Sequence, residues 1–235
     1  MHTSITSADL MVRRAERADL PFVAWCNYEA SSPYPGFCYW DPLLEATNTP
    51  TMAFIEAVFR TDALAWGRVE DFHVVTDDAG KPIAGASGFT MDADDYRPLR
   101  LDRLPLVAES LGWSAAALDG FLQGYQSVWA DPHDPTLAPS ASWIIECVAV
   151  IPEARGRGVA KRLMRALLAQ GKAQGHTHAG ISVTMGNDAA QRVYEAVGFR
   201  LYMSYGSAYF DDAFPGTIKY RARLTDAHAS AEAKP

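Results

Sequence analysis

The spacing of hydrophobic residues becomes regular in the last part of the chain. From residue 142 onward, short apolar runs alternate with segments whose apolar residues recur every three or four positions. The pattern predicts strands at 143–150, 181–185 and 218–224, and helices at 156–173 and 188–197. Such alternation implies helices packed on a sheet, with parallel pairing of the strands that flank the long helix.

The chain before residue 142 is less regular. A short strand at 11–15 leads into a helix that starts near Asp19. Strands at 72–75 and 82–91 are separated by turn-forming residues at 77–80. An antiparallel hairpin is therefore expected there.

Two further helices are indicated in this first part. Thr49 is expected to cap a helix that begins at Pro50. Another helix has Ser114 as its N-cap and carries a stripe of apolar residues at helical spacing. The stripe consists of Leu118, Phe121, Leu122, Tyr125 and Trp129. Such a stripe would serve the contact of a homodimer as well as a lid over a site.

The length of 235 residues exceeds one average domain and falls short of two. Two less regular segments, 31–70 and 92–141, account for the surplus, because the rest is close to one ordinary domain. We therefore expect one domain over residues 1–225 with insertions at about these positions. Residues 226–235 are expected to form a flexible tail.

Composition narrows the range of partners and locations. The formal net charge of -7 and the pI near 5.3 disfavour nucleic acid as a partner. The sequence after Met1 has no targeting pattern, and no apolar run is long enough for a membrane span. The three cysteines and six histidines lack the spacing of a metal site. We expect a cytoplasmic protein with reduced thiols, no metal and no membrane contact.

The first candidate for chemistry lies where the strand at 143–150 ends. A loop with two glycines, Gly156 and Gly158, precedes a helix. Glycines let the backbone approach a ligand, and the first N–H groups of a helix lack intrahelical partners, so this junction favours an anion such as phosphate. The glycine spacing matches neither the nucleotide phosphate loop nor the dinucleotide fingerprint. Taken alone, the loop is equally well explained as a turn that binds nothing.

A second motif changes this balance. Asn187 is a good N-cap and Gly198 a good residue to end a helix. The two motifs read R-x-x-G-x-A at 155–160 and N-x-x-A-x-x-x-Y-x-x-x-G-F at 187–199. Together they resemble the GCN5-related N-acetyltransferase (GNAT) superfamily. The resemblance is close over residues 142–206.

The resemblance implies an α/β (α+β) fold of GNAT type. Such a domain has a mixed central sheet with helices on both faces, and this chain would add a helical insertion between the third and fourth strands. The resemblance also implies that acetyl-CoA is the co-substrate. In the family, its diphosphate lies on the glycine-containing loop and its pantetheine arm lies beside the strand that precedes the loop. The residues so implied are Val148, Ala149, Val150, Arg155, Gly156, Arg157, Gly158, Val159, Ala160, Asn187 and Tyr194.

Tyr194 is implied by the resemblance to reach the thioester sulfur. Acetyl transfer to an amine needs a proton for the departing thiolate, and a phenol can donate one. Tyr194 is therefore the expected general acid. The alternative is an aromatic residue on the buried stripe that includes Ala190 and Val197.

Glu146 is the candidate general base, because an amine at neutral pH is mostly protonated. Its strand is otherwise apolar, so a carboxylate there needs a partner or a function. The alternative is a glutamate at a hydrated rim or paired with an arginine. Cys147 is expected to point to the opposite face and to be a core thiol.

The acceptor is expected to be bound by segments that precede the strand at 143–150. Candidate walls are Tyr34, Phe37, Tyr39 and Trp40, and candidate charges for a cation are Asp92, Asp94 and Asp95. A packed cover and a solvated turn are the alternatives.

We expect transfer of acetyl from acetyl-CoA to a primary amine of a small molecule, by direct attack in a ternary complex. Transfer to a peptide or protein amine, or a non-catalytic acyl-CoA sensor, are the competing functions.

Overall fold

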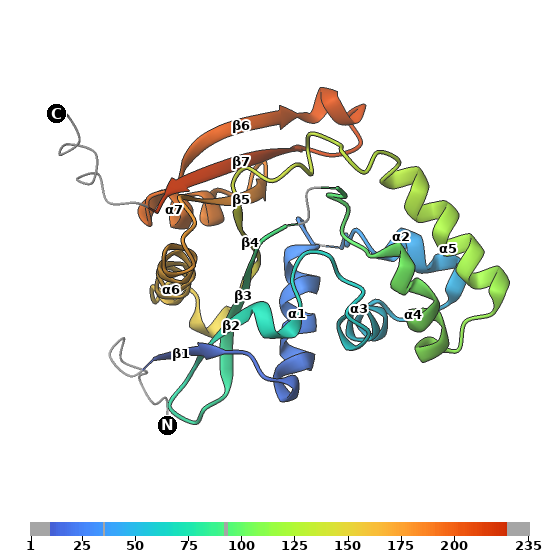
Figure 1. The fold of residues 1–235 in the computed structure, drawn as a ribbon, viewed down its shortest axis with the longest axis horizontal. Helices are drawn as coiled ribbons and strands as arrows, with labels where there is room; N and C mark the ends of the chain where they lie inside the picture. Colours follow the sequence, from blue (N-terminus) through green and yellow to red (C-terminus); the bar gives the residue numbers. More distant parts are fainter. Residues whose placement is uncertain (1–9, 35, 92–93, 225–235) are drawn as a thin grey trace.

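One sheet of seven strands organises the computed structural model, which describes residues 10–34, 36–91 and 94–224 (Figure 1). The strands are β1 Met11–Arg14, β2 Phe72–Thr76, β3 Pro82–Phe89, β4 Trp143–Val150, β5 His178–Thr184, β6 Arg200–Gly206 and β7 Gly216–Arg223. Their order in the sheet is β1-β2-β3-β4-β5-β7-β6. Only β4 and β5 pair in parallel among these strands, as the sequence predicts for the strands that flank the long helix.

Helices cover both faces of the sheet (Figure 1). On one face lie α6 Val159–Ala173 and α7 Asp188–Ala196. On the other face, α1 Leu20–Ala30 packs directly on β3 and β4, and α3 Thr51–Arg60 packs on α1. The remaining helices, α2 Asp41–Leu44, α4 Leu104–Leu111 and α5 Ala115–Val128, form an outer layer on this side.

The expected mixed sheet with a helical insertion between the third and fourth strands is confirmed. The insertion supplies α4 and α5, of which only α5 was predicted. Ser114 caps α5 as expected, because its Oγ accepts the N–H of Ala117 at 3.2 Å. The predicted hairpin is present as β2 and β3.

The prediction that Thr49 caps α3 is wrong. Pro50 occupies the cap position, and the helix begins at Thr51. The hydroxyl of Thr49 instead accepts a hydrogen bond from the indole N–H of Trp113, at 2.7 Å. Trp113 lies between α4 and α5, so this bond ties the second insertion to the start of α3.

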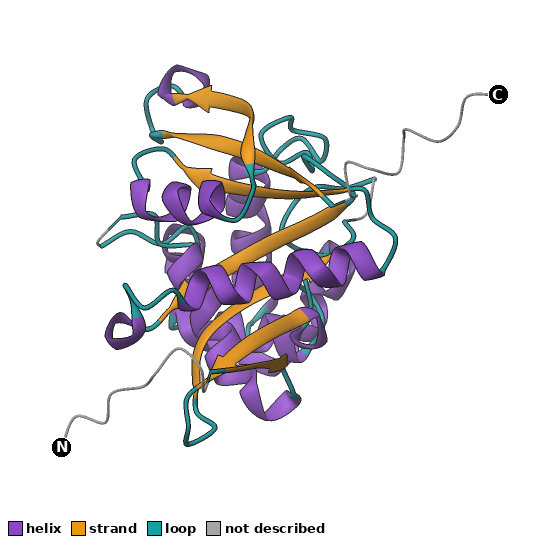
Figure 2. Ribbon diagram, turned by 90° about the vertical axis from the view of Figure 1, so that its left-hand side faces the viewer, coloured by secondary structure: helices purple, strands orange, loops and turns teal. Residues whose placement is uncertain are grey.

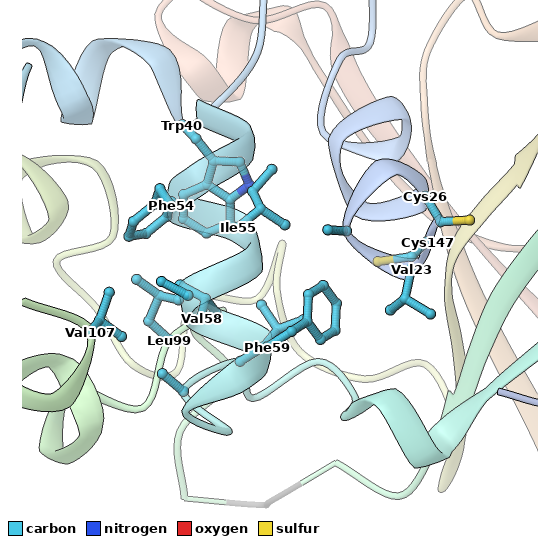
Figure 3. Packing of buried hydrophobic residues seen from close by; sticks show 14 of the residues in the cluster. Val23, Cys26, Trp40, Phe54, Ile55, Val58, Phe59, Leu99, Val107 and Cys147 are labelled. Atoms are coloured by element: carbon cyan, nitrogen blue, oxygen red, sulfur yellow. The ribbon is translucent and has the colours of Figure 1, made fainter. Parts of the chain in front are cut away.

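The apolar stripe of α5 faces inward, which corrects its expected use as a lid or a homodimer contact. Phe121 and Tyr125 are fully buried. Leu118, Leu122 and Trp129 are partly buried against the same core. This core also contains Trp40 and Phe54 and extends to Cys147 of β4 (Figure 3). The two insertions therefore pack on each other and on α1.

Gly171→Ala should destabilise the fold by about 1–3 kcal/mol through overpacking. A methyl group at Gly171 of α6 would lie 2.5 Å from Cδ1 of Trp143, whose indole N–H donates to the carbonyl of Leu167. Urea unfolding measures the effect. Gly124→Ala in α5 is the matched control, because its methyl would meet Leu43 at an ordinary 3.5 Å. Equal stability changes in the two variants would contradict this packing.

Candidate active site

The site is built around a β-bulge in β4. Cys147 has a φ of 57°, in the left-handed region that non-glycine residues rarely adopt. The pairing of β3 with β4 shifts register at the same place, between Gly85 and Ser87. These features are typical of a bulge, which bends a strand and interrupts its pairing.

The two parallel strands separate beyond the start of β4. Pairing between β4 and β5 is limited to Trp143 with Ala179 and Ile144 with Gly180. The strands then diverge toward their carboxyl ends, as the orange arrows in Figure 2 show. The β5 side of β4 is thus without a strand partner from residue 145 onward among the described strands.

Hydrogen bonds from three elements surround the bulge. The amide N–H of Asn27 in α1 donates to Sγ of Cys147 at 3.4 Å, and the indole N–H of Trp40 donates to Oδ1 of Asn27 at 3.2 Å. From β3, the hydroxyl of Ser87 donates to the carbonyl of Glu146 at 3.2 Å. Because these groups are buried, their bonds favour this one backbone conformation.

The bulge also changes which face Cys147 occupies. Ile145 packs in the core under α6, whereas Cys147 and Ala149 pack in the core under α1. Glu146 is the pairing partner of Ser87 in the neighbouring strand β3, and it also lies on the face of the sheet that α1 covers. The prediction that Cys147 points away from Glu146 is therefore wrong, because the extra residue of a bulge breaks the alternation of a strand. Cys147 is buried, as expected of a core thiol.

Glu146 combines burial with a nearby positive charge. Burial raises the pKa of its carboxyl group to about 7. The ammonium group of Lys219 and a hydrogen bond from the backbone N–H of Cys147 oppose this increase. A carboxyl group with a pKa near 7 can accept a proton at neutral pH and release it again.

Tyr194 lies on α7 and is buried. Its ring contacts Phe199 and Tyr220, each with a centroid distance of 6.1 Å. Burial raises the pKa of the phenol well above its usual value, and electrostatic interaction with Glu146, and with Cys147 where its thiol is ionised, raises it further. The phenol is therefore protonated at neutral pH and interacts electrostatically with Glu146, although the two residues come from opposite faces of the sheet.

The glycine-containing loop has the expected open backbone. Gly156 and Gly158 have φ angles of 75° and 78°, and a Cβ on either residue would meet no atom within 4 Å. The helix α6 begins directly after Gly158. Its first N–H groups have no intrahelical partners and carry the positive end of the helix dipole. This loop suits a diphosphate.

Two of the predicted coenzyme-binding side chains already have protein partners. Arg155 donates to the carbonyl of Val150 at 3.0 Å and to the carboxylate of Glu29 at 3.3 Å. The side chain of Asn187 caps α7 by accepting the N–H of Ala190 at 3.1 Å. Both residues thus hold the backbone of the motifs in place, whereas Arg157 is exposed beside the loop.

The predicted acceptor walls lie in different places. Trp40 belongs to the α1 core. Tyr34, Phe37 and Tyr39 contact one another in series, and Tyr39 also contacts Phe214 in the loop before β7. Burial raises the pKa of Tyr39 to about 12 and a hydrogen bond with Thr184 at the end of β5 opposes this shift. These three rings are placed beside the separated strands.

The acidic residues predicted to attract a cation already have interaction partners where the structure describes them. Asp95 forms an ion pair with Arg97, with an N–O distance of 2.7 Å, so its charge is compensated. Asp94 has an interaction partner as well. Asp92 lies outside the described residues.

Sequence reasoning did not find Asn27 or Lys219. Lys219 occupies a strand in which Ile218, Tyr220 and Ala222 alternate with polar residues. That alternation predicts an exposed lysine, whereas residues 138–140 cover it in the structure. Asn27 gave no signal, because its partners are distant in sequence.

Comparisons with known proteins show the family to which the chain belongs. The model of the acetyltransferase (GNAT) family matches residues 39–199. The chain therefore belongs to the GNAT acetyltransferase family. No curated protein sequence matches it significantly.

Solved structures share the fold at low sequence identity. The structure of SsHAT is 17% identical, with a TM-score of 0.59 and coverage of 93% of this chain and 100% of that one. A GCN5-related N-acetyltransferase from Kribbella flavida is 16% identical, with a TM-score of 0.56 and coverage of 93% and 99%. The structure of yncA from Salmonella typhimurium, with its cofactor acetyl-CoA, is 15% identical, with a TM-score of 0.50 and coverage of 96% and 99%.

Two kinds of feature are missing from the described residues. No group of three or more His, Cys, Asp or Glu side chains in that part of the chain is arranged to hold a metal ion. None of its helices has both the length and the apolar character needed to cross a membrane.

Glu146→Gln should change the pH dependence of stability. The carboxyl group of Glu146 keeps its proton up to about pH 7 in the folded protein, whereas in the unfolded chain it loses the proton near its ordinary pKa of 4.5. Because the folded state binds this proton more tightly than the unfolded state, the contribution of Glu146 to the free energy of unfolding of the wild type decreases as pH rises from about 5 to 7. The free energy of unfolding of Glu146→Gln, relative to wild type, should increase between pH 5 and pH 8 by an amount on the order of 2 kcal/mol.

Urea unfolding at the two pH values measures this difference. Glu153→Gln, at an exposed position in the loop after β4, is the matched control. A relative stability of Glu146→Gln that is the same at pH 5 and pH 8 would contradict the raised pKa.

Proposed function

We propose that this chain transfers the acetyl group of acetyl-CoA to the primary amine of a small molecule. The observation that carries this proposal is the position of Glu146 and Tyr194, which interact electrostatically across the separated strands β4 and β5. A proton acceptor and a proton donor thus flank the gap between β4 and β5.

The coenzyme would lie along the open edge of β4. The backbone N–H groups that follow Gly156 and Gly158 would hold its diphosphate, because these groups have no intrahelical partners. The main chain of Val148, Ala149 and Val150, together with Asn187, belongs to the same proposed binding surface. Membership of the GNAT family supports acetyl-CoA as the donor.

The proposed reaction needs two proton transfers. Glu146 removes a proton from the ammonium form of the acceptor, and the free amine attacks the thioester carbonyl. The carbon–sulfur bond then breaks, and Tyr194 donates a proton to the departing thiolate. Loss of the surplus proton that the acetylated nitrogen still carries, through solvent to the tyrosinate, then restores Tyr194. Glu146 releases its own proton to solvent. The products are the acetylated amine, coenzyme A and one proton from the original ammonium group, so acyl group and protons balance.

A covered site supports a small acceptor over a peptide or protein amine. The side chain of Lys219 donates to the carbonyl of Ala138, and Arg221 donates to the carbonyl of Ser140 at 2.6 Å. The hydroxyl of Ser140 in turn donates to the carbonyl of Tyr220 at 2.9 Å. Residues 138–140 are thereby fixed on β7, over the face that carries Glu146.

The cellular location is part of the same proposal. Cys26, Cys38 and Cys147 are free and buried. Buried thiols without disulfides fit a reducing cytoplasm, where acetyl-CoA is at hand.

Turnover with acetyl-CoA and a panel of amines tests the proposed function. The panel contains amino acids, polyamines, aminoglycosides and short peptides, and release of free thiol is the readout. We expect turnover with at least one small amine. Turnover with peptides alone would support the competing acceptor class, and tight coenzyme binding without any turnover would support a sensor.

Tyr194→Phe should lower kcat by about 10²–10⁴-fold, because it removes the proton donor for the thiolate. The KM for acetyl-CoA should change little, since the ring and its packing remain. Steady-state kinetics under conditions where chemistry is rate-limiting provide the measurement. Tyr202→Phe, at an exposed position of β6, is the control. Full activity in Tyr194→Phe would remove the assignment of Tyr194 as general acid.

A further inference from the structure

Lys219 is an unusual lysine, because only 2% of its surface is exposed. It lies within the sheet, in β7, where it pairs with Ser182 of β5 and Met203 of β6. A buried ammonium group is unfavourable unless it has hydrogen bonds or an opposite charge nearby. The position of Lys219 therefore calls for a partner.

The side chain of Lys219 points toward the face that carries Glu146. Its neighbour Tyr220 points to the other face, because its hydroxyl donates to Glu195 of α7 at 3.1 Å. Successive residues of a strand point to opposite faces. Lys219 is thus directed away from α7, to the side on which Glu146 lies.

The surroundings of Lys219 provide one neutral acceptor and two negative charges. Its ammonium group donates to the carbonyl of Ala138. The carboxylates of Glu146 and Asp134 attract it electrostatically, and the contribution of Glu146 is the larger. Asp134 accepts the backbone N–H of Thr136 at 2.7 Å and the hydroxyl of Tyr209 at 3.4 Å, so it already has its own donors.

The other groups near Glu146 do not supply a positive charge. Burial raises the pKa of the Cys147 thiol to about 12, and the phenol of Tyr194 is likewise protonated at neutral pH. Asn27 and Ser87 are uncharged. In the described part of the chain, Lys219 is the cation whose charge opposes the effect of burial on the pKa of Glu146.

We propose that Lys219 is a positioning residue for the reaction, and that its buried ammonium group keeps Glu146 in the carboxylate form that can accept a proton. This inference rests on the proposed function, in which Glu146 is the base. Without the charge of Lys219, burial alone would act on Glu146 and favour its protonated form at neutral pH. A protonated carboxyl group cannot take a proton from the amine.

The pH profile of kcat/KM tests this role. Lys219→Met, which keeps the length and removes the charge, should move the acidic limb upward by about one pH unit. Activity at pH 7 should fall by about fivefold and recover at higher pH. Lys219→Arg should restore the acidic limb toward its wild-type position. Lys81→Met, in the exposed turn between β2 and β3, is the matched control for loss of one lysine.

An acidic limb that stays in place in Lys219→Met would overturn the proposal, because a purely structural lysine lowers activity at all pH values alike. Lys219→Gln is the second neutral variant, since its amide can still donate to the carbonyl of Ala138. It keeps the test open if the methionine variant does not fold.

A titration that does not depend on activity separates this inference from the proposed function. Carbon-13 NMR of glutamate-labelled protein follows the carboxyl groups, and Glu146→Gln identifies the signal of Glu146. The midpoint for Glu146 should rise in Lys219→Met. If the enzyme turns over an amine but the titration midpoint of Glu146 is unchanged in Lys219→Met, only the link between Lys219 and Glu146 is refuted, and the proposed function stands. A raised midpoint in a protein that acetylates no amine would refute the proposed function and leave the link standing.

Discussion

The separation of β4 from β5 is the constraint on which the candidate site depends. The bulge at Cys147 lies in the same strand, and its left-handed backbone costs on the order of 1–2 kcal/mol in a non-glycine residue. Among the described strands, the edge of β4 that faces β5 has no partner beyond Ile144, and the bulge places Glu146 and Cys147 on the same face.

The two insertions contribute to this constraint from a distance. Phe54 of α3 contacts Trp40, Trp113 and Phe121, so the first insertion and the second share one aromatic core. Trp40 in turn donates to Asn27 of α1, and Asn27 donates to Cys147. A continuous series of buried contacts therefore links α5 to the bulge. The helices of the insertions thus pack behind the bulge, whereas residues 138–140, at the end of the second insertion, cover Lys219 on β7.

The sequence predicted the elements whose signals are local. The alternation of β4, α6, β5 and α7 is confirmed because each element has its own periodicity and boundary residues. The family motif likewise lies within two short segments. The errors concern contacts between distant residues. The hydroxyl of Thr49 accepts a hydrogen bond from Trp113 of the second insertion, and Cys147 lies in a bulge that breaks its alternation with Glu146.

Lys219 is a proposed functional residue that the local sequence could not predict, because its burial depends on residues far away in the chain. Its strand has the pattern of a half-exposed sheet, and the local sequence gives no sign that residues about eighty positions earlier lie over it. The burial that gives Glu146 and Lys219 their shifted pKa values is therefore a property of tertiary packing. A motif can locate the candidate acid and base, whereas their protonation states depend on the residues that enclose them.

The electrostatic coupling between Glu146 and Tyr194 orders the two proton transfers of the proposed reaction. While Glu146 is a carboxylate, its charge raises the pKa of Tyr194 and makes the phenol a poor donor to a thiolate, whose own pKa is about 8.5 in a model thiol. Once Glu146 has taken a proton from the amine, that charge is gone and the pKa of Tyr194 falls. The acid thus becomes stronger only after the base has acted, which is when the thiolate begins to leave.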